Sequence, residues 1–198
     1  STLQTLVKRE LVELVEEAAE FNVSNMKKRG PAHLDFIFSP AQKAALTAIQ
    51  QAADSRKFSV GLLHGVTGSG KTAVYLAAMQ SVLESGRSAI LLVPEIGLTP
   101  AAAFNLHQVF GDEVAILHSA LTGDERAEQW HRIRRGEARI VVGTRSAVFA
   151  PVANLALIVV DEEHDSSYKQ EETPRYHGRD VAVMRGKLGD AAVVLASA

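Results

Sequence analysis

Six short apolar runs divide the chain, and most of the stretches between them have the spacing of amphipathic helices. The runs cover 58–63, 88–93, 114–117, 138–142, 155–160 and a region around Val193 and Val194. Continuous apolar runs of this length are typical of strands that are buried on both faces, as in a parallel sheet covered by helices on both sides. The pattern therefore predicts an α/β fold with a mostly parallel sheet.

Capping signals place the helices between these runs. Ser39 is a suitable N-cap and Pro40 a suitable first residue for a helix over 41–53. Further helices are predicted directly after Gly70, over 101–110, and from Thr122, where acidic residues come first and arginines last, as the helix dipole favours. Ligands of such sheets bind at the carboxyl ends of the strands, so the chemistry is expected in the segments that follow them.

The first thirty residues form a separate part in this interpretation. Apolar positions in 1–20 recur at close to helical spacing, which predicts a packing or linker helix. The alternative is a helix through Lys8 followed by a strand at 11–15, as at the end of a winged-helix module. The polar stretch 25–31, which ends in Gly-Pro, is typical of a linker. We therefore expect 1–30 to be the end of a winged-helix module or a linker helix, and 31–198 to be the main domain.

Composition excludes several classes of protein. The 198 residues carry a net charge of -2, so nucleic-acid binding would depend on a local basic patch. The sequence contains no cysteine, which excludes a disulfide framework and a cysteine-based zinc site in this stretch. No signal peptide opens the chain and no run is long enough to span a bilayer, so no membrane association and a cytoplasmic location are expected. Both ends interrupt a pattern, which suggests an excised piece of a longer protein.

The strongest chemical signal is the stretch 65–72, which has the P-loop spacing G-x-x-x-x-G-K-[ST] between a predicted strand and a predicted helix. In such a loop, backbone N–H groups point at phosphate oxygens and the helix N-terminus adds its dipole. Lys71 would reach the terminal phosphates, and the Thr72 hydroxyl would bind Mg²⁺. The alternative is a chance Gly-Lys-Thr in a surface turn. The predicted phosphate-binding residues are Gly65, Thr67, Gly68, Ser69, Gly70, Lys71 and Thr72.

A second signal is the acidic end of the apolar run 155–160. Asp161 is expected to hold Mg²⁺, and Glu162 to orient or deprotonate the attacking water. The alternative is a charged strand end that only faces solvent. Gln42, in the first turn of the predicted helix 41–53, could pair with the edge of adenine, although most glutamines on helices are simply solvated. The sequence lacks the Asn-Lys-x-Asp run of guanine-specific GTPases.

These motifs, in this order, resemble the motor of superfamily 2 helicases of the DEAH-like type. The stretch 65–72 matches motif I, 161–164 (Asp-Glu-Glu-His) motif II, 93–100 motif Ia, 142–151 the motif Ib region, and 196–198 a motif III cut before its usual threonine. The amino-acid sequences of 65–72 (Gly-Val-Thr-Gly-Ser-Gly-Lys-Thr) and of 161–170 are similar to those of the bacterial primosomal replication-restart helicases. The resemblance covers 36–198 and implies a RecA-like P-loop NTPase lobe.

The resemblance also implies a function. It implies an ATP-dependent 3′-to-5′ DNA translocase acting at stalled forks, with ATP and Mg²⁺ as cofactors and Lys71, Asp161 and Glu162 as catalytic residues. Gln42 would be the adenine contact of this family. The implied partners are single-stranded and forked DNA, the primosome and single-strand-binding proteins, with the motor a monomer. The family's zinc site, arginine finger and second lobe would lie outside this chain, so the piece alone should hydrolyse ATP poorly and unwind nothing.

Several residues at strand ends are candidates for DNA binding or for coupling DNA binding to hydrolysis. Thr99 and the compact group Thr144, Arg145 and Ser146 offer donors to DNA phosphates. For Arg145, DNA contact or bracing between motifs is favoured over the alternative of an ordinary surface ion pair. The loop 168–179 mixes aromatic and cationic residues, which suits stacking on bases, unless its tyrosines are incidental. Its candidates are Tyr168, Lys169, Arg175 and Tyr176. His164 is expected to hydrogen-bond toward 196–198 and relay the nucleotide state.

Three rival functions remain open at the level of sequence. The first is another superfamily 2 translocase, RecG-like or of the restriction type. The second is a P-loop kinase of a nucleotide or metabolite, although a kinase would not need His164 after the acids. The third is a nucleotide-gated binding module without catalysis, which the intact set Lys71, Thr72, Asp161 and Glu162 disfavours.

Overall fold

The computed structural model describes residues 36–198, and within them a six-stranded parallel sheet organises the chain. The sheet has the order β1-β8-β5-β2-β4-β3, and every neighbouring pair is parallel. The strands are β1 (Ser59–His64), β2 (Ser88–Leu92), β3 (Val114–Leu117), β4 (Ile140–Gly143), β5 (Leu155–Val160) and β8 (Ala192–Ser197). The predicted α/β fold and its six strands are confirmed. The helix or winged-helix end predicted for 1–30, and the boundary after it, lie outside the described residues.

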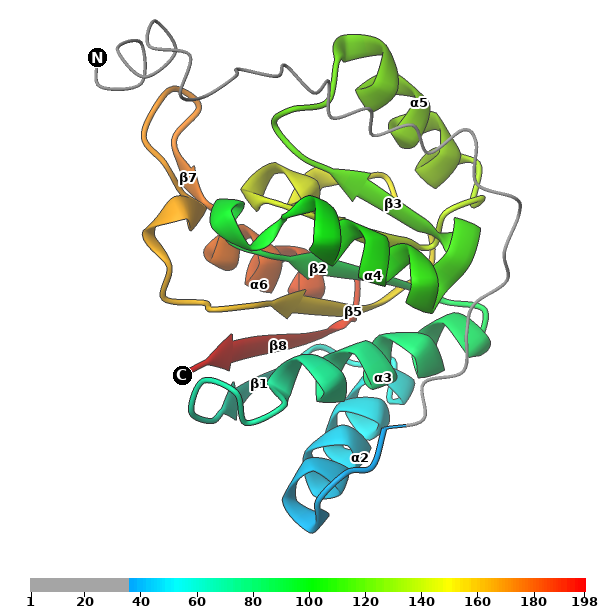
Figure 1. The fold of residues 1–198 in the computed structure, drawn as a ribbon, viewed down its shortest axis with the longest axis vertical. Helices are drawn as coiled ribbons and strands as arrows, with labels where there is room; N and C mark the ends of the chain where they lie inside the picture. The colour runs from blue at the N-terminus through cyan, green and yellow to red at the C-terminus, as the bar shows by residue number, and fades with distance from the viewer. Residues whose placement is uncertain (1–35) are drawn as a thin grey trace, which may run out of the picture.

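Within residues 36–198, five helices cover the two faces of this sheet. Helices α2 (Pro40–Asp54), α3 (Lys71–Glu84) and α4 (Pro100–Phe110) pack on one face, while α5 (Gly123–Arg134) and α6 (Gly178–Leu188) pack on the other. Figure 1 shows α3 and α4 in front of the sheet and α6 behind it. Short 3₁₀ turns follow three strands: η2 (Glu95–Gly97) after β2, η4 (Arg145–Phe149) after β4 and η5 (Ser166–Tyr168) after β5. A fourth, η3 (Gly111–Glu113), connects α4 to β3. A small antiparallel hairpin pairs β6 (Lys169–Gln170) with β7 (Tyr176–His177).

The helix starts are fixed by side-chain caps that the sequence predicts. The Ser39 hydroxyl accepts from the Gln42 backbone N–H, and the Gln42 side chain accepts from the Ser39 N–H, which completes a capping box before Pro40. Thr122 and Glu125 form the same reciprocal pair at the start of α5. Each box satisfies helix N–H groups that would otherwise lack a partner.

The hydrophobic core forms two layers because alternate strand residues point to opposite faces. In β2, Ala89 and Leu91 face the α2–α4 side, whereas Ile90 and Leu92 face the α5–α6 side, and every residue of β2 is buried. Strand β1 departs from the expected double burial. Its Leu62 is 63% exposed, because β1 lies at an edge of the sheet.

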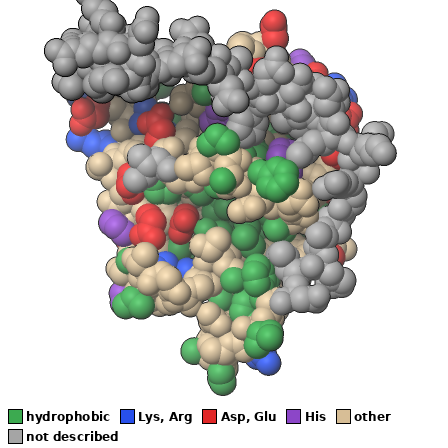
Figure 2. Space-filling model, in the orientation of Figure 1, with side chains coloured by type: hydrophobic (Ala, Val, Ile, Leu, Met, Phe, Trp, Pro, Cys, Tyr) green, Lys and Arg blue, Asp and Glu red, His purple; other side chains and the backbone are tan. Residues whose placement is uncertain are grey.

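The parallel arrangement brings the carboxyl ends of all six strands to one edge of the sheet. In Figure 1 the strand arrows point to the left, so the loop after β1, the end of β8 and the β6–β7 hairpin lie on that side. On the face drawn in Figure 2, hydrophobic side chains occupy the middle and acidic and histidine side chains gather at the left edge. The segments after β1, β2, β4 and β5 therefore meet at one edge, as expected for a ligand site.

Candidate nucleotide-binding and coupling site

The loop between β1 and α3 has the backbone of a phosphate cradle. Gly68 and Gly70 adopt φ values of +80° and +83°, which are left-handed conformations that favour glycine. Helix α3 begins at Lys71, so its N-terminal N–H groups and positive dipole end face the loop. The Ser69 hydroxyl is buried and has no hydrogen-bond partner among the described residues. A buried donor without a partner fits a loop built to receive a ligand oxygen.

Lys71 lies inside this loop. Its side chain is largely buried, with a residue exposure of 9%. Its Nζ lies 2.5 Å from the Gly65 carbonyl oxygen and 3.4 Å from that of Val66. Loop carbonyls thus hold the ammonium group beside the loop, where it could exchange these acceptors for phosphate oxygens.

Gln42 connects helix α2 to the same loop. Its Nε2 donates to the Ser69 carbonyl oxygen at 2.8 Å, and its Oε1 accepts from the Ser39 N–H at 2.8 Å. A β-carbon built on Gly70 would lie only 2.5 Å from this Nε2, so the contact also requires glycine at that position. The amide keeps a second N–H and a second lone pair. The adenine contact of Gln42 therefore stays a prediction, now with a defined anchor beside the loop.

Tyr75 joins the two residues predicted to bind magnesium, and the sequence analysis missed it. The Tyr75 hydroxyl oxygen lies 3.1 Å from Asp161 Oδ2 and 3.3 Å from Thr72 Oγ1. Its ring is buried in the core beside the sheet. The signal for it is its position three residues after Thr72, which places both side chains on one face of α3. The structure thus brings together Thr72 and Asp161, which are 89 residues apart in the sequence.

Burial governs the charge state of this pair. Desolvation raises the pKa of Asp161, and the nearby Glu162 charge raises it further, while the hydrogen bond from Tyr75 opposes the shift. Burial and the Asp161 charge also raise the pKa of the Tyr75 phenol far above its usual value. The phenol therefore stays a hydrogen-bond donor to the carboxylate at neutral pH.

Glu162 has a strained backbone. Its φ is +44°, in the left-handed region, which costs a residue with a β-carbon roughly 1–2 kcal/mol. The conformation is held because the Glu162 carbonyl accepts from the Asp165 N–H at 2.8 Å, and because the flanking Asp161 and Glu163 N–H groups bond to Leu92 and Ala196. Non-glycine residues in such conformations concentrate at functional sites. The bend turns the chain directly after Asp161.

The predicted contact between His164 and the segment 196–198 is confirmed. His164 Nδ1 lies 3.3 Å from the Ser197 hydroxyl, and its Nε2 lies 3.8 Å from Glu162 Oε2. Glu163 forms an ion pair of 2.9 Å with Arg179 at the start of α6. The acidic segment, residues 161–164, is therefore linked both to the end of β8 and to α6.

The expectation that Tyr168 stacks on DNA bases is wrong. Its side chain is fully buried, with 0% exposure, and its hydroxyl oxygen lies 2.6 Å from the Asp161 carbonyl oxygen and 3.0 Å from that of Leu92. A mixture of aromatic and cationic residues does not show which ring is buried, and here the turn η5 directs Tyr168 under the sheet edge. Tyr168 joins the ends of β2 and β5 instead.

Arg145 braces the segment that leads to Tyr168. Its Nη1 donates to the Ser167 carbonyl oxygen at 2.9 Å, and it forms no ion pair with another described residue. The bracing alternative is thus what the structure contains. The other strand-end candidates lie at the same edge: Thr144 is half-buried, Ser146 is exposed, and the exposed Thr99 hydroxyl caps α4 by accepting from the Ala102 N–H. Their phosphate contacts stay predictions.

The remaining loop candidates gather on the β6–β7 hairpin. Lys169, Arg175 and Tyr176 border an open groove of about 630 Å³. Lys169 is ion-paired with Glu171 at 3.0 Å, and Arg175 donates to the Glu171 carbonyl oxygen. The Tyr176 ring meets the half-exposed Phe149 edge to face, at 5.2 Å between ring centres. The hairpin therefore presents the aromatic and cationic surface that Tyr168 does not.

The fold and the site together define a P-loop NTPase lobe with the architecture of superfamily 2 helicase motors. A solved structure of RecG bound to a three-way DNA junction matches 83% of this chain and 21% of its own, with a TM-score of 0.55 and 25% identity. The chain belongs to the DEAD/DEAH box helicase family, whose sequence model matches residues 39–198.

Curated relatives narrow the similarity further. The chain is 46% identical over its full length to the replication restart protein PriA of Bacillus subtilis (strain 168), and 49% identical over 80% of its length to that of Chlamydia pneumoniae. It spans 24% and 21% of those two proteins. Within residues 36–198, no helix has the length and apolar character needed to cross a bilayer.

Proposed function

We propose that this chain is the nucleotide-hydrolysing lobe of an ATP-dependent DNA helicase that translocates 3′ to 5′ along single-stranded DNA during replication restart. The observation that carries the proposal is the meeting of the P-loop residue Thr72 and the strand-end acid Asp161 through the Tyr75 hydroxyl. A metabolite kinase gains nothing from the further links of this acidic segment to Ser197 and to Arg179.

The residues at the site fit ATP with Mg²⁺. Thr72 and Asp161 offer the oxygen donors that Mg²⁺ prefers, and the unpartnered Ser69 hydroxyl and the N-terminus of α3 offer donors to phosphate. Bound Mg²⁺ would neutralise charge on the β- and γ-phosphates. Lys71 would exchange its loop carbonyls for phosphate oxygens, and Glu162 would orient the attacking water.

Coupling to DNA would run through the links around the acidic segment. Tyr168 fixes the Asp161 carbonyl, Arg145 holds the carbonyl of Ser167 directly before Tyr168, and His164 contacts Ser197. Lys169, Arg175 and Tyr176 follow immediately on the hairpin and are suited to phosphates and bases. Single-stranded DNA would be held by the hairpin and by Thr99, Thr144, Arg145 and Ser146. Its binding would shift Asp161 and Glu162 through these links.

The similarity to replication restart proteins supports the finer assignment. We assign single-stranded and forked DNA as substrates, the primosome and single-strand-binding proteins as partners, a monomeric motor, and the cytoplasm as its location. The second lobe and the zinc site would lie in the rest of the longer protein.

The decisive test is the ATPase activity of the full-length protein with and without single-stranded DNA. We expect DNA to stimulate ATP hydrolysis. Lys71→Ala should abolish hydrolysis, because Lys71 is the one cationic side chain of the P-loop, residues 65–72. Activity that DNA leaves unchanged would argue for a kinase or another NTPase instead.

The similarity to a junction-bound RecG favours one alternative, a translocase that acts on branched DNA. Strand-displacement assays of the full-length protein separate the two. Preferential unwinding of a fork with a single-stranded gap supports the restart helicase, whereas regression of a three-way junction supports the alternative.

A further inference from the structure

A second cavity lies at the opposite end of the sheet from the P-loop. It has a volume of about 740 Å³ and is bordered by the segments that lead into β1, β2, β5 and β8. Since all these strands are parallel, these segments lie at the amino-terminal edge, a full strand length from Thr72 and Asp161. The proposed motor chemistry uses none of the residues around this cavity.

Three guanidinium groups border it, from Arg56, Arg87 and Arg185. Two of them are fixed by backbone carbonyl groups. Arg185 donates to the carbonyls of Val148 and Ala150, the second at 2.6 Å, and Arg87 donates to that of Ala53 at 2.6 Å. Carbonyl oxygens hold a guanidinium in place without neutralising its charge, and each group keeps further N–H donors.

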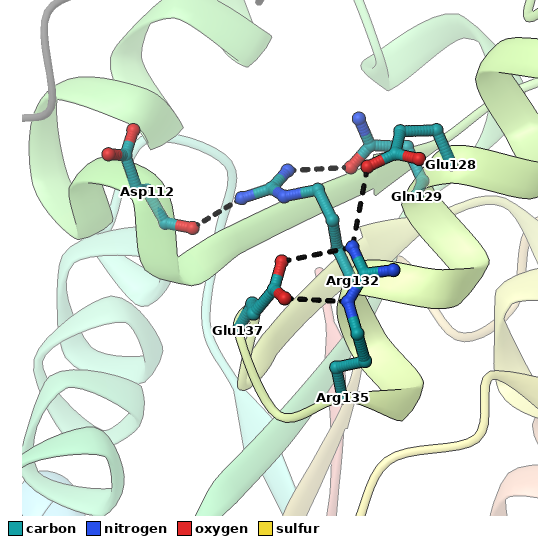
Figure 3. Close-up of polar contacts among 6 residues, drawn as sticks. All are labelled: Asp112, Glu128, Gln129, Arg132, Arg135 and Glu137. Carbon is teal, nitrogen blue, oxygen red and sulfur yellow. Dashed lines mark hydrogen bonds and ion pairs between the residues drawn. The ribbon is translucent and has the colours of Figure 1, made fainter.

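These three arginines form no ion pair with another residue of 36–198, in contrast to Arg135 and Arg139. Figure 3 shows Arg135 bonded to Glu128 and Glu137, and Arg139 is likewise paired with Glu113. At the cavity, burial and then the nearby Arg56 charge lower the pKa of Arg87, and Asp54 opposes that shift.

The nearby acids do not cancel this positive charge. Asp190 is the one carboxylate among the described residues that border the cavity, and Asp54 lies close to Arg87. The three guanidiniums and Asp190 leave the lining with a surplus of two positive charges. Gathering uncompensated positive charge at a partly buried site costs free energy, which an anion would recover.

We propose that this cavity binds a phosphate oxyanion. Planar guanidiniums match the geometry of phosphate. Arg87 and Arg185 are already held in a fixed orientation, and the exposed Arg56 can approach the same group from a third segment. The same chemistry could come from a free polyphosphate such as pyrophosphate, or from a phosphodiester of duplex DNA that reaches the amino-terminal edge of the lobe.

Two binding measurements on the 198-residue chain test the proposal, both with saturating ADP and Mg²⁺ so that the P-loop is filled. One titrates inorganic pyrophosphate by calorimetry, and the other titrates a fluorescent 20-base-pair duplex by anisotropy. The variant is Arg56→Gln, because Arg56 is exposed and makes no hydrogen bond within the described residues, so the fold should survive. The matched control is Arg135→Gln, which removes an equal charge at the C-cap of α5.

We expect Arg56→Gln to weaken binding about five- to tenfold, the effect of losing one charge-assisted contact, and Arg135→Gln to leave it unchanged. If Arg56→Gln weakens only pyrophosphate binding, the ligand of the cavity is a free phosphate compound. If it weakens duplex binding, the ligand is the phosphodiester backbone of DNA. Absence of pyrophosphate binding together with equal duplex affinity for the two variants overturns the proposal. Arg87→Gln provides a second test in the same assays. It should lower the affinity for the same ligand, pyrophosphate or duplex, that Arg56→Gln affects.

Discussion

The Tyr75 hydroxyl lies 3.1 Å from the Asp161 carboxylate and joins the P-loop helix to the end of the central strand β5. The bond connects two motifs that the sequence presents as independent. Because the same hydroxyl also lies 3.3 Å from Thr72, it holds both proposed magnesium ligands in one orientation. Tyr75 is thus a positioning residue for the ion rather than a ligand.

Tyr75→Phe should raise the Mg²⁺ requirement of the full-length protein. The substitution keeps the buried ring and removes only the hydroxyl, so Thr72 and Asp161 lose their common partner. We expect the free Mg²⁺ needed for half-maximal ATPase to rise about three- to tenfold, as for one lost hydrogen bond. The control is Tyr176→Phe on the β7 strand, which should leave the requirement unchanged. A Tyr75→Phe enzyme with wild-type Mg²⁺ dependence would contradict the positioning role.

Tyr168→Phe should destabilise the fold without directly removing a DNA contact. The Tyr168 hydroxyl is the hydrogen-bond donor to the Asp161 carbonyl, and its loss leaves that partly buried acceptor without a partner among the described residues. We expect a loss of about 1–2 kcal/mol in the free energy of unfolding, measured with urea. Tyr176→Phe, on the neighbouring hairpin, should cost less than about 0.5 kcal/mol. Equal stability of the two variants would show that the Tyr168 bonds contribute nothing.

Particular residues show what the sequence could and could not predict. The strands β3 and β5 and the start of α2 follow from apolar runs and from the Ser39 cap, because these signals are local. The burial of Tyr168 and the role of Tyr75 depend on which strands are neighbours in the sheet. The order β8-β5-β2 cannot be inferred from any short stretch of the sequence. Exposure of Leu62 has the same origin, since an apolar run does not say that its strand lies at an edge.

Gly70→Ala should abolish tight nucleotide binding through two separate effects. The alanine would have to adopt a φ of +83°, which costs about 1–2 kcal/mol, and its β-carbon would displace the Gln42 amide from the loop. We expect at least a tenfold loss of ADP affinity in a fluorescence titration. Gly86→Ala is the matched control, because Gly86 has a φ of +75° but open space around it. It should lose similar stability and keep its ADP affinity, so equal affinities in the two variants would refute the assignment.

Asp161→Asn should stabilise the nucleotide-free chain at neutral pH while removing Mg²⁺-dependent hydrolysis from the full-length protein. Burial raises the pKa of Asp161 in the folded state, so the unfolded chain loses this proton first as the pH rises. The stability that protonated Asp161 contributes is therefore present below its unfolded pKa and lost as the pH rises through its folded pKa. Asparagine does not titrate and should keep that contribution at pH 7.

The matched control is Asp165→Asn, for which the expected change of stability with pH has the opposite sign. Hydrogen bonds from Ser167 lower the pKa of Asp165, so its contribution is present above its ordinary pKa and lost as the pH falls through the lowered one. Thermal unfolding between pH 3 and pH 8 checks both variants. Relative to the parent chain, Asp161→Asn should gain melting temperature with rising pH, and Asp165→Asn should lose it. If Asp161→Asn were less stable than the parent chain at pH 7, the Tyr75 bond, and not burial, would dominate the energetics of this carboxylate.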